Sequence, residues 1–290
     1  MAEWTAPGAQ VANRLSLRAK ERLVTFGVWL ALAAGALIIA FPLYWMVATT
    51  VMTREDAYSR ELILAPPKVI FDNYINGWNN SPWPRWYGNT LIIVVTSVAG
   101  LTLFGLMSGF AFAKYQFRGR NLLFLLILST LMIPLQVLLL PRFLLVARMG
   151  WANTHWSVIG PHMADIFGLF FARQFMLEIP DELLEAARLD GAGEFTIFTR
   201  VVVPLAKPAI AVLVILGFSA RWNAFAWPLV ALTRQDMYTV QLGINYMKGY
   251  YFTDFPAVIS MVVVSIIPIL IMFLTFQRYF IEGIARTGIK

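Results

Sequence analysis

The 290-residue sequence predicts an all-α polytopic membrane protein with six transmembrane helices. Charged residues make up 13% of the chain, about half the share found in soluble domains, and the mean hydropathy is +0.67. A helix needs about 20 mostly apolar residues to cross the hydrocarbon core of a bilayer. Stretches of this kind fall at about 24–48, 87–112, 121–146, 156–175, 208–232 and 256–277.

Three of these stretches need separate justification. The first follows a basic segment, as in a signal peptide, but its apolar run exceeds the roughly 7–15 residues of a signal-peptide core, so we interpret it as an uncleaved span. The third contains Pro134 and Pro141, and proline kinks a membrane helix because it frees a backbone carbonyl. The fourth carries His162 and Asp165, which makes it the weakest of the six candidates.

The lysine and arginine residues indicate how the spans are oriented. If the N-terminus is cytoplasmic, the cytoplasmic segments hold about twice as many of these residues as the external loops, as the positive-inside rule requires. Both termini and the 176–207 loop are therefore predicted to be cytoplasmic, and the 49–86 loop external. Three tryptophans of the external loop suit the aromatic belt at a membrane interface: Trp78, Trp83 and Trp86.

The chain is predicted to form one membrane domain, 24–277, between a cytoplasmic N-terminal segment, 1–23, and a cytoplasmic tail, 278–290. Its composition excludes several kinds of chemistry. There is no cysteine, and His155 and His162 are too few and too badly spaced for a metal site. No G-x-x-x-x-G-K-[ST] pattern is present, so we expect no phosphate-binding loop, no bound cofactor and no catalytic site.

The 176–207 loop predicts an amphipathic helical hairpin. Pro180 suits the first turn of a helix, where no amide donor is needed, and the acidic residues after it suit the positive end of the helix dipole. Gly191 and Gly193 are expected to end this helix, because glycine readily adopts the left-handed conformation. A second short helix is expected to break at Pro204. The apolar side of the first helix is predicted to hold Leu183, Leu184, Ala187 and Leu189.

By periodicity alone, such a helix is typical of one that lies on a membrane surface. Its spacing, however, resembles the "EAA" loop of binding-protein-dependent ABC importers, whose pattern is E-A-A-x3-G-x9-I-x-L-P, with valines here in place of the isoleucine and leucine. A lone E-A-A carries little information, but the full pattern before the penultimate span is specific. The matching residues are Glu185, Ala186, Ala187, Gly191, Val201, Val203 and Pro204.

Other stretches resemble the carbohydrate-uptake permeases of that family, from about residue 24 to the end. The segment that ends in AFAKYQFRGR resembles the family's second span and its A-Y-A-x-A-R-x-x-F-x-G-R ending, with Phe112 and Lys114 where tyrosine and arginine are commoner. RWNAFAWPL resembles the W-N-x-F-x-W-P-L run of the fifth span, and QRYFIEGIARTGIK resembles the family tail.

The resemblance implies a type I ABC importer permease fold with a cytoplasmic coupling helix at about 180–191. The chain would form half of the translocation pathway for a sugar or oligosaccharide in a bacterial plasma membrane. The implied partners are a second permease subunit in a heterodimer, two cytoplasmic ABC ATPase subunits that use ATP and magnesium, and an external solute-binding protein. The implied ATPase-coupling residues are Glu185, Ala186, Ala187, Asp190, Gly191 and Pro204.

Polar and aromatic side chains at mid-membrane depth are candidates for the solute pathway, because charged groups there are costly and usually mark a path. Packing and hydrogen bonds between helices account for each of them as well, and an ion pair between Asp165 and Arg142 is a further alternative. The pathway candidates are Gln136, Trp222, Asn223, Phe225 and Trp227, together with the charged or titratable residues Arg142, His162, Asp165 and Arg221.

Several alternatives stay open. Aromatic residues of the external 233–255 loop suit contact with a binding protein and anchoring at the interface equally. A transported glycerol phosphate or phosphodiester would meet Arg142 or Arg221. An ion-coupled secondary transporter would need intramembrane acids, and Asp165 is the only acid in the six stretches. A membrane enzyme is disfavoured by the absence of cysteine and of clustered acids at depth.

Overall fold

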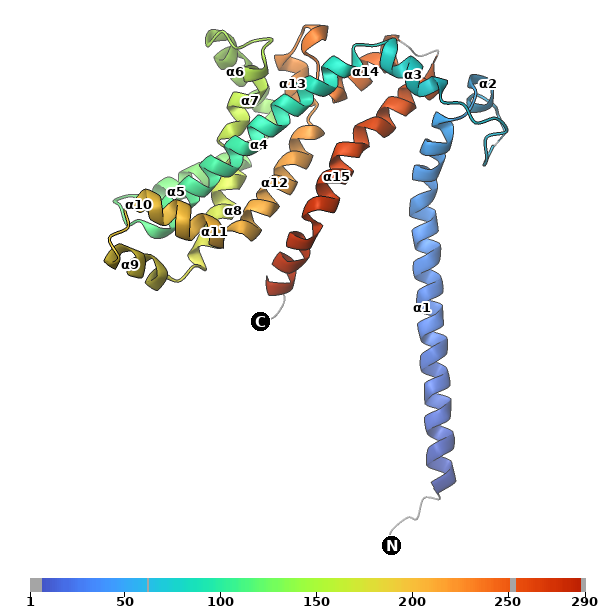
Figure 1. Ribbon diagram of the computed structural model, residues 1–290, viewed down its shortest axis with the longest axis horizontal. Helices are drawn as coiled ribbons and strands as arrows, with labels where there is room; N and C mark the ends of the chain where they lie inside the picture. Colours follow the sequence, from blue (N-terminus) through green and yellow to red (C-terminus); the bar gives the residue numbers. More distant parts are fainter. Residues whose placement is uncertain (1–6, 62, 251–253, 288–290) are drawn as a thin grey trace. The chain divides into compact units, whose positions relative to one another are not determined.

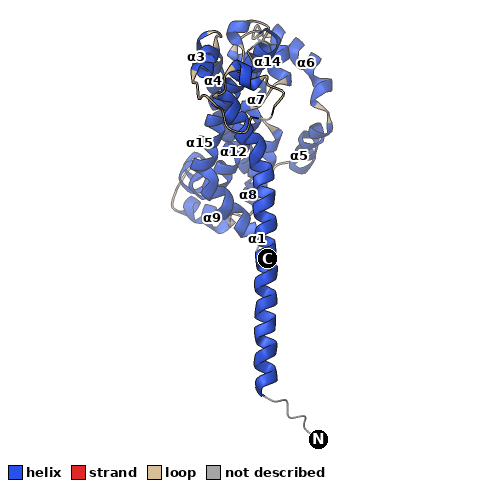
Figure 2. Cartoon of the chain, turned by 90° about the vertical axis from the view of Figure 1, so that its right-hand side faces the viewer, coloured by secondary structure: helices blue, strands red, loops and turns tan. Residues whose placement is uncertain are grey.

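The computed structural model describes residues 7–61, 63–250 and 254–287, and the side chains of residues 20, 22–61, 63–249 and 254–277. All regular structure within these residues is helical (Figure 2). The chain divides into two compact units, residues 1–72 and 73–290, which are described separately.

The first unit is dominated by one helix, α1 (Pro7–Thr50). Its Arg22–Thr50 part is long and apolar enough to cross a membrane, because leucine, alanine and isoleucine predominate along it. A short helix, α2 (Arg54–Ala57), follows in the same unit. Thr53 caps α2 by accepting a hydrogen bond from the Asp56 amide at 3.2 Å.

The second unit holds the helices that Figure 1 labels from α3 onward. Many are short, because prolines and glycines interrupt the apolar stretches. In chain order they are α3 (Asp72–Asn79), α4 (Trp83–Lys114), α5 (Arg120–Ser129), η1 (Thr130–Met132), α6 (Leu135–Arg148), α7 (His155–Met163), α8 (Ile166–Leu177), α9 (Asp181–Leu189), α10 (Glu194–Ile197), η2 (Phe198–Val202), α11 (Val203–Leu205), α12 (Lys207–Trp222), α13 (Ala226–Ala231), η3 (Gln235–Met237), α14 (Val240–Tyr250) and α15 (Phe255–Thr287).

Helix α4 is the centre of the second unit. It packs along α7 and α8 and also contacts α12, which in turn packs on α15 (Figure 1). Glycine makes the approach of α4 to α8 possible. A Cβ added at Gly105 would lie 3.1 Å from Gly168, and one at Gly109 would lie only 2.6 Å from the Cβ of Ala172. Small residues of this kind allow membrane helices to approach closely.

Within the described residues, three helices are long and apolar enough to span a membrane, namely Arg22–Thr50, Trp83–Lys114 and Phe255–Gln277. Two further stretches qualify only as bent pairs: α5 and η1 meet α6 at 106°, and the 194–205 stretch meets α12 at 75°. The predicted fourth span is divided into α7 and α8. The all-α polytopic fold class is confirmed, and the number of six crossings stays a prediction.

The prediction that the external tryptophans lie in the aromatic belt at a membrane interface is wrong for two of the three. Trp78 is exposed, but Trp83 and Trp86 are fully buried against α14 and α15. The Trp86 indole N–H also donates to the Gln235 carbonyl at 2.8 Å. A tryptophan in an interface belt and one in a core look alike in sequence, because both occur where an apolar helix meets a loop.

Candidate functional site

The hairpin between α8 and α12 begins with α9. Pro180 stands directly before this helix, and Gly191 ends it with a φ of +80°, in the left-handed region that glycine tolerates best. The Ala192 amide closes the turn by donating to the Ala187 carbonyl at 3.0 Å. The prediction for Gly191 is confirmed. Gly193, with a φ of −72°, instead precedes α10 in an extended conformation, so its predicted left-handed role is wrong.

The second arm of the hairpin runs farther than predicted. Helical geometry continues from α10 through a π-helical turn, η2, and through Pro204 to Leu205, and the chain turns into α12 only at Ala206. The predicted break at Pro204 is therefore wrong. Proline removes one amide donor from a helix, and here it follows a wide π turn in which the regular hydrogen-bond ladder has already shifted.

One leucine anchors the hairpin to the helix bundle. Leu184 is only 2% exposed and lies in an apolar cluster with residues of α4, α8 and the second arm, among them Phe110, Met176 and Phe198. Removing a buried leucine from water stabilises a fold by about 1.5–3 kcal/mol. The anchor thus fixes the inner side of α9 against the ends of α4 and α8.

The outer side of the hairpin carries exposed apolar residues. Leu189 is 90% exposed and Phe195 is 77% exposed, one on each side of the Gly191 turn. Leu183 is exposed as well, so the predicted apolar side of α9 is divided between an inner and an outer surface. The predicted coupling residues Glu185, Ala186, Asp190, Gly191 and Pro204 are also exposed, and Ala187 is half-buried.

Charged groups tie both ends of α9 to the end of α4. The Lys114 ammonium donates to the Ile179 carbonyl at 2.5 Å and to Asp181 Oδ1 at 2.6 Å. At the other end of α9, Arg188 Nε donates to Glu194 Oε1 at 2.8 Å, and the Tyr115 hydroxyl donates to Glu194 Oε2. The sequence did not single out this set of contacts.

These bonds shift the pKa values of the groups that make them. The hydrogen bond from Arg188, and after it the one from Tyr115, holds the pKa of Glu194 below its usual value, since both favour the carboxylate. Burial, and after it the bond to Glu194, raises the pKa of Tyr115 to about 12. At any pH between the lowered pKa of Glu194 and the raised pKa of Tyr115, the carboxylate is ionised and the hydroxyl keeps its proton. The hydrogen bond between them requires this state.

A second polar cluster lies where the fourth predicted span is broken. Asp165 caps α8 by accepting from the Phe167 amide at 2.9 Å, and its second oxygen accepts from Arg221 of α12, also at 2.9 Å. Arg221 donates in addition to the carbonyls of His162, at 3.0 Å, and Gly217, at 3.3 Å. The His162 carbonyl stands at the end of α7, so Arg221 satisfies a group that the break in the helix leaves free.

The expected partner of Asp165 is different from the observed one. The ion pair joins Asp165 to Arg221, whereas Arg142 lies over the Trp227 ring at 4.6 Å from its centroid. A guanidinium over an indole is a cation–π contact worth about 0.5–2 kcal/mol. Arg142 is thus held at the edge of this cluster by an aromatic face.

The five pathway candidates do not share one surface. Trp222 and Trp227 are buried, and their indole N–H groups donate to the carbonyls of Ser265 and Ser157 at 2.9 and 3.1 Å. The other three, Gln136, Asn223 and Phe225, are exposed in this chain, and the Asn223 amide donates to the Ser219 carbonyl at 2.9 Å.

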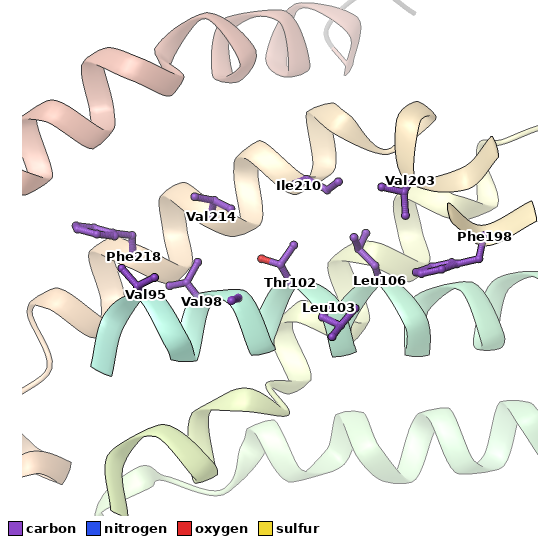
Figure 3. A pocket seen from close by; sticks show the side chains of 11 residues that line it. Val95, Val98, Thr102, Leu103, Leu106, Phe198, Val203, Ile210, Val214 and Phe218 are labelled. Carbon is purple, nitrogen blue, oxygen red and sulfur yellow. The ribbon is translucent and has the colours of Figure 1, made fainter. Parts of the chain in front are cut away.

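An apolar cleft of about 500 Å³ lies between α4, α12 and the second arm of the hairpin (Figure 3). Thr102 is the only polar residue on its lining, and none of the pathway candidates lines it. A sugar needs hydrogen-bond partners for its hydroxyl groups. The cleft therefore lacks the chemistry of a sugar site.

The aromatic external loop is described in part. Tyr246 of α14 is half-buried and packs against Trp86 in a T-shaped arrangement, with ring centroids 6.1 Å apart. The Tyr250 side chain lies outside the described residues, as do Tyr251, Phe252 and the side chains of the predicted tail from Glu282 to Lys290. The helix α15 carries the backbone of that tail as far as Thr287.

The helical fold and the hairpin before α12 define a polytopic transport component of a membrane. Residues 101–286 match the family described as "Binding-protein-dependent transport system inner membrane component". The chain belongs to this family, and is thus a permease component of an inner-membrane ABC transporter.

Curated relatives match along most of their length. The chain is 37% identical over 259 residues to the arabinooligosaccharides transport system permease protein AraQ of Halalkalibacterium halodurans, covering 88% of this chain and 92% of the relative. It is 35% identical to the AraQ protein of Bacillus subtilis, with the same coverage. It is 31% identical over 261 residues to the sn-glycerol-3-phosphate transport system permease protein UgpE of Escherichia coli, covering 87% and 93%.

Solved structures have the same fold. One is a bacterial ABC transporter involved in the import of the acidic polysaccharide alginate, with a TM-score of 0.77, 22% identity, and coverage of 96% of this chain and 100% of that chain. Another is a bacterial alginate ABC transporter in complex with an alginate pentasaccharide-bound periplasmic protein, with a TM-score of 0.66, 16% identity, and coverage of 91% and 96%. At these identities the likeness concerns the fold, which is that of an ABC importer permease.

Proposed function

We infer that this chain forms half of the translocation pathway of an ATP-driven importer for a sugar or oligosaccharide. The observation that carries this inference is the hairpin, which presents Leu189 and Phe195 to its surroundings next to Glu185 and Ala186. Large apolar side chains left exposed on an otherwise polar segment suit a contact with another protein. The spacing of the EAA pattern supports an ATPase as the protein that covers them.

The proposed complex contains a second permease subunit, two ABC ATPase subunits and an external solute-binding protein. In this arrangement the chain is not a catalyst, and ATP hydrolysis with magnesium belongs to the ATPases. Both termini and the hairpin lie on the cytoplasmic side, as the lysine and arginine distribution predicts. Closure of the ATPases moves the hairpin, and with it α8 and α12, to which it is joined along the chain.

The proposed solute class rests on two observations. The two AraQ relatives are named for arabinooligosaccharides, and the exposed pathway candidates are one amide in α6, one amide directly after α12, and one aromatic ring. We propose that Gln136, Asn223 and Phe225 contact the uncharged sugar, and that Trp222 and Trp227 support the wall behind them.

A glycerol phosphate is the second candidate solute, because the UgpE relative is named for it. Arg221 is already engaged by Asp165, so Arg142 would be the cation that meets the phosphate. Replacing Arg142 by glutamine separates the two solutes. Import of a phosphate ester should fall by about tenfold or more, because a charge-assisted hydrogen bond is lost, whereas import of a neutral oligosaccharide should change little.

Affinity purification of the tagged chain from its native membrane tests the assembly. We expect one ABC ATPase and a second permease to purify with it, and a Leu189→Asp variant to lose the ATPase while it keeps the second permease. Purification of the wild-type chain without any ATPase would contradict the proposed function.

A further inference from the structure

The end of α4 is linked to both ends of the coupling helix α9, directly at its start and through Glu194 of α10 at its end, although α4 has no chain connection to the hairpin. Lys114 is the final residue of α4 and Tyr115 follows it directly. Their partners lie 65 to 79 positions farther along the chain. This arrangement is a bracket of two adjacent side chains that holds a helix at its start and at its end.

The first half of the bracket is nearly buried. The Lys114 side chain is 6% exposed, and its ammonium is held by the Ile179 carbonyl, two residues before α9, and by the carboxylate of Asp181, the first residue of α9. A buried ammonium needs such partners, since an unpaired buried charge is costly. The position of the start of α9 is thereby fixed relative to the end of α4.

The second half acts through one carboxylate. Glu194, the first residue of α10, accepts from the Tyr115 hydroxyl and from Arg188 in the last turn of α9. The Tyr115 ring also packs edge-on against Phe110 of the apolar cluster, with centroids 5.3 Å apart. Glu194 therefore connects the end of α9 to α4 through two charge-assisted bonds.

The end of α4 is itself firmly held. Arg173 of α8 donates to the Phe112 carbonyl at 3.3 Å, and Arg120 donates to the Tyr115 carbonyl at 3.0 Å. These cations satisfy carbonyls at the helix C-terminus and complement its negative dipole end. The bracket thus joins α9 to a helix end whose own carbonyls are held by other side chains.

We propose that Lys114 and Tyr115 are positioning residues that make α4 a third carrier of the motion of the coupling helix, beside α8 and α12. This inference rests on the proposed function, because it assumes that an ATPase moves α9. Without the bracket, α9 would still be attached through its chain connections and Leu184, but it could tilt against the bundle. Part of the motion of the ATPase would then tilt α9 and would not move the helices of the bundle.

The chain contains no cysteine, so a pair of introduced cysteines can carry spin labels at defined sites. Labels at Met107 of α4 and Glu182 of α9, both exposed positions, report the distance between the two helices in the assembled complex. The test variant is Lys114→Met, which keeps the length of the side chain but removes the charge. The matched control is Lys207→Met, at an exposed lysine at the start of α12 that makes no ion pair among the described residues.

We expect Lys114→Met to broaden the distance distribution and to lower ATP hydrolysis stimulated by the solute-loaded binding protein by about tenfold, the scale of a lost charge-assisted bond. The ATPase should still purify with the variant. Lys114→Arg should restore both readings, Tyr115→Phe should show a smaller broadening, and Lys207→Met should show none.

An unchanged distance distribution and an unchanged stimulation in Lys114→Met would overturn the bracket while leaving the proposed function intact. A wild-type complex without an ATPase would instead refute the proposed function, whatever the spin labels report. Loss of the ATPase from Lys114→Met but not from Lys114→Arg would also contradict the proposal, because the residue would then build the docking surface and not position it.

Discussion

Two ionic joints connect helices of this chain, and they differ in how exposed their charged groups are. In the bracket at the end of α4, the lysine is buried but the carboxylates of Asp181 and Glu194 face outward. In the joint at the broken fourth span, Arg221 is buried at 7% exposure and Asp165 is shielded for most of its surface. Water and salt can screen the first joint, because its carboxylates are exposed. They reach the second joint much less, and we call it the closed joint.

The difference assigns the joints different roles. Exposed ion pairs are worth about 0–1 kcal/mol, whereas removing one partner of a buried pair costs about 3–5 kcal/mol. The Asp165–Arg221 pair is therefore expected to hold the start of α8 strongly to α12. The Lys114–Asp181 pair of the bracket has one buried and one exposed partner, so its strength lies between these limits and sets how tightly α9 follows the bundle.

The largest effect is expected where the closed joint loses its acid. Asp165→Ala leaves the Arg221 guanidinium buried without its carboxylate and removes the cap of α8, so it should destabilise the fold by about 3–5 kcal/mol. The measurement is the yield and the apparent melting temperature of the purified complex. Asp165→Asn keeps one of the two oxygens that accept these bonds, so it should fall between the alanine variant and the wild type. Equal stability of all three would contradict the buried pair.

The two leucines of α9 provide the next comparison. Leu184→Ala should destabilise the packing of the hairpin by about 2–5 kcal/mol, because it empties a buried site. Leu189→Ala should change stability by less than about 0.5 kcal/mol, since its side chain is exposed. Amide exchange across α9 measures the stability of the hairpin in both variants. Capture of the ATPase measures what each leucine contributes to the outer surface. The same ranking of the two variants in both assays would show that the inner and outer surfaces are not separate.

A smaller effect is expected at the turn of the hairpin. Gly191→Ala puts a side chain on a residue with a φ of +80° and should cost about 1–2 kcal/mol. Gly193→Ala, at a φ of −72° and with no neighbouring atom within 4 Å of an added Cβ, should cost almost nothing. Protease sensitivity of the hairpin compares the two, and equal sensitivity would argue against the observed turn.

The smallest effect concerns the pH response of the bracket. The pKa of Glu194 is lowered, so its contribution is fully present above its ordinary value of 4.5 and is lost as the pH falls through the lowered pKa. The pKa of Tyr115 is raised, so its contribution is fully present below 10.0 and is lost as the pH rises through about 12. The bracket is therefore intact across neutral pH.

Because Arg188 is the main cause of the lowered pKa of Glu194, Arg188→Gln should move the acid transition to higher pH more than Tyr115→Phe does. The mobility of a spin label at position 182, followed while the pH is lowered, reports the transition. A larger movement in Tyr115→Phe would reverse the assigned order of causes.

The sequence allowed the hairpin to be predicted but not its attachment. The spacing from Glu185 to Gly191 is local, and a glycine just after a helical pattern commonly ends the helix in a left-handed conformation, which the φ of Gly191 confirms. The partners of Lys114 lie at least 65 positions away, and such pairing depends on which helices the bundle brings together. Without the contact of α4 with α8, Lys114 looks like any basic residue at the cytoplasmic end of a span.

Two errors have the same origin. The sequence predicts an interface belt for Trp83 and Trp86 because the pattern of residues does not distinguish lipid from a neighbouring helix. The sequence offers Arg142 as a partner for Asp165, because separation in the sequence does not reveal that α12 brings Arg221 to the break between α7 and α8. In both cases the tertiary contact decides, and it involves helices that are far apart in the sequence.

The central claim is that transport by this chain requires an ATPase seated on α9. Proteoliposomes that hold the purified complex, with ATP inside and the solute-loaded binding protein outside, test it most directly. Uptake should depend on ATP, and the Leu189→Asp variant should abolish uptake while the second permease remains bound. Uptake by the permease subunits alone, without ATPase or ATP, would contradict the account.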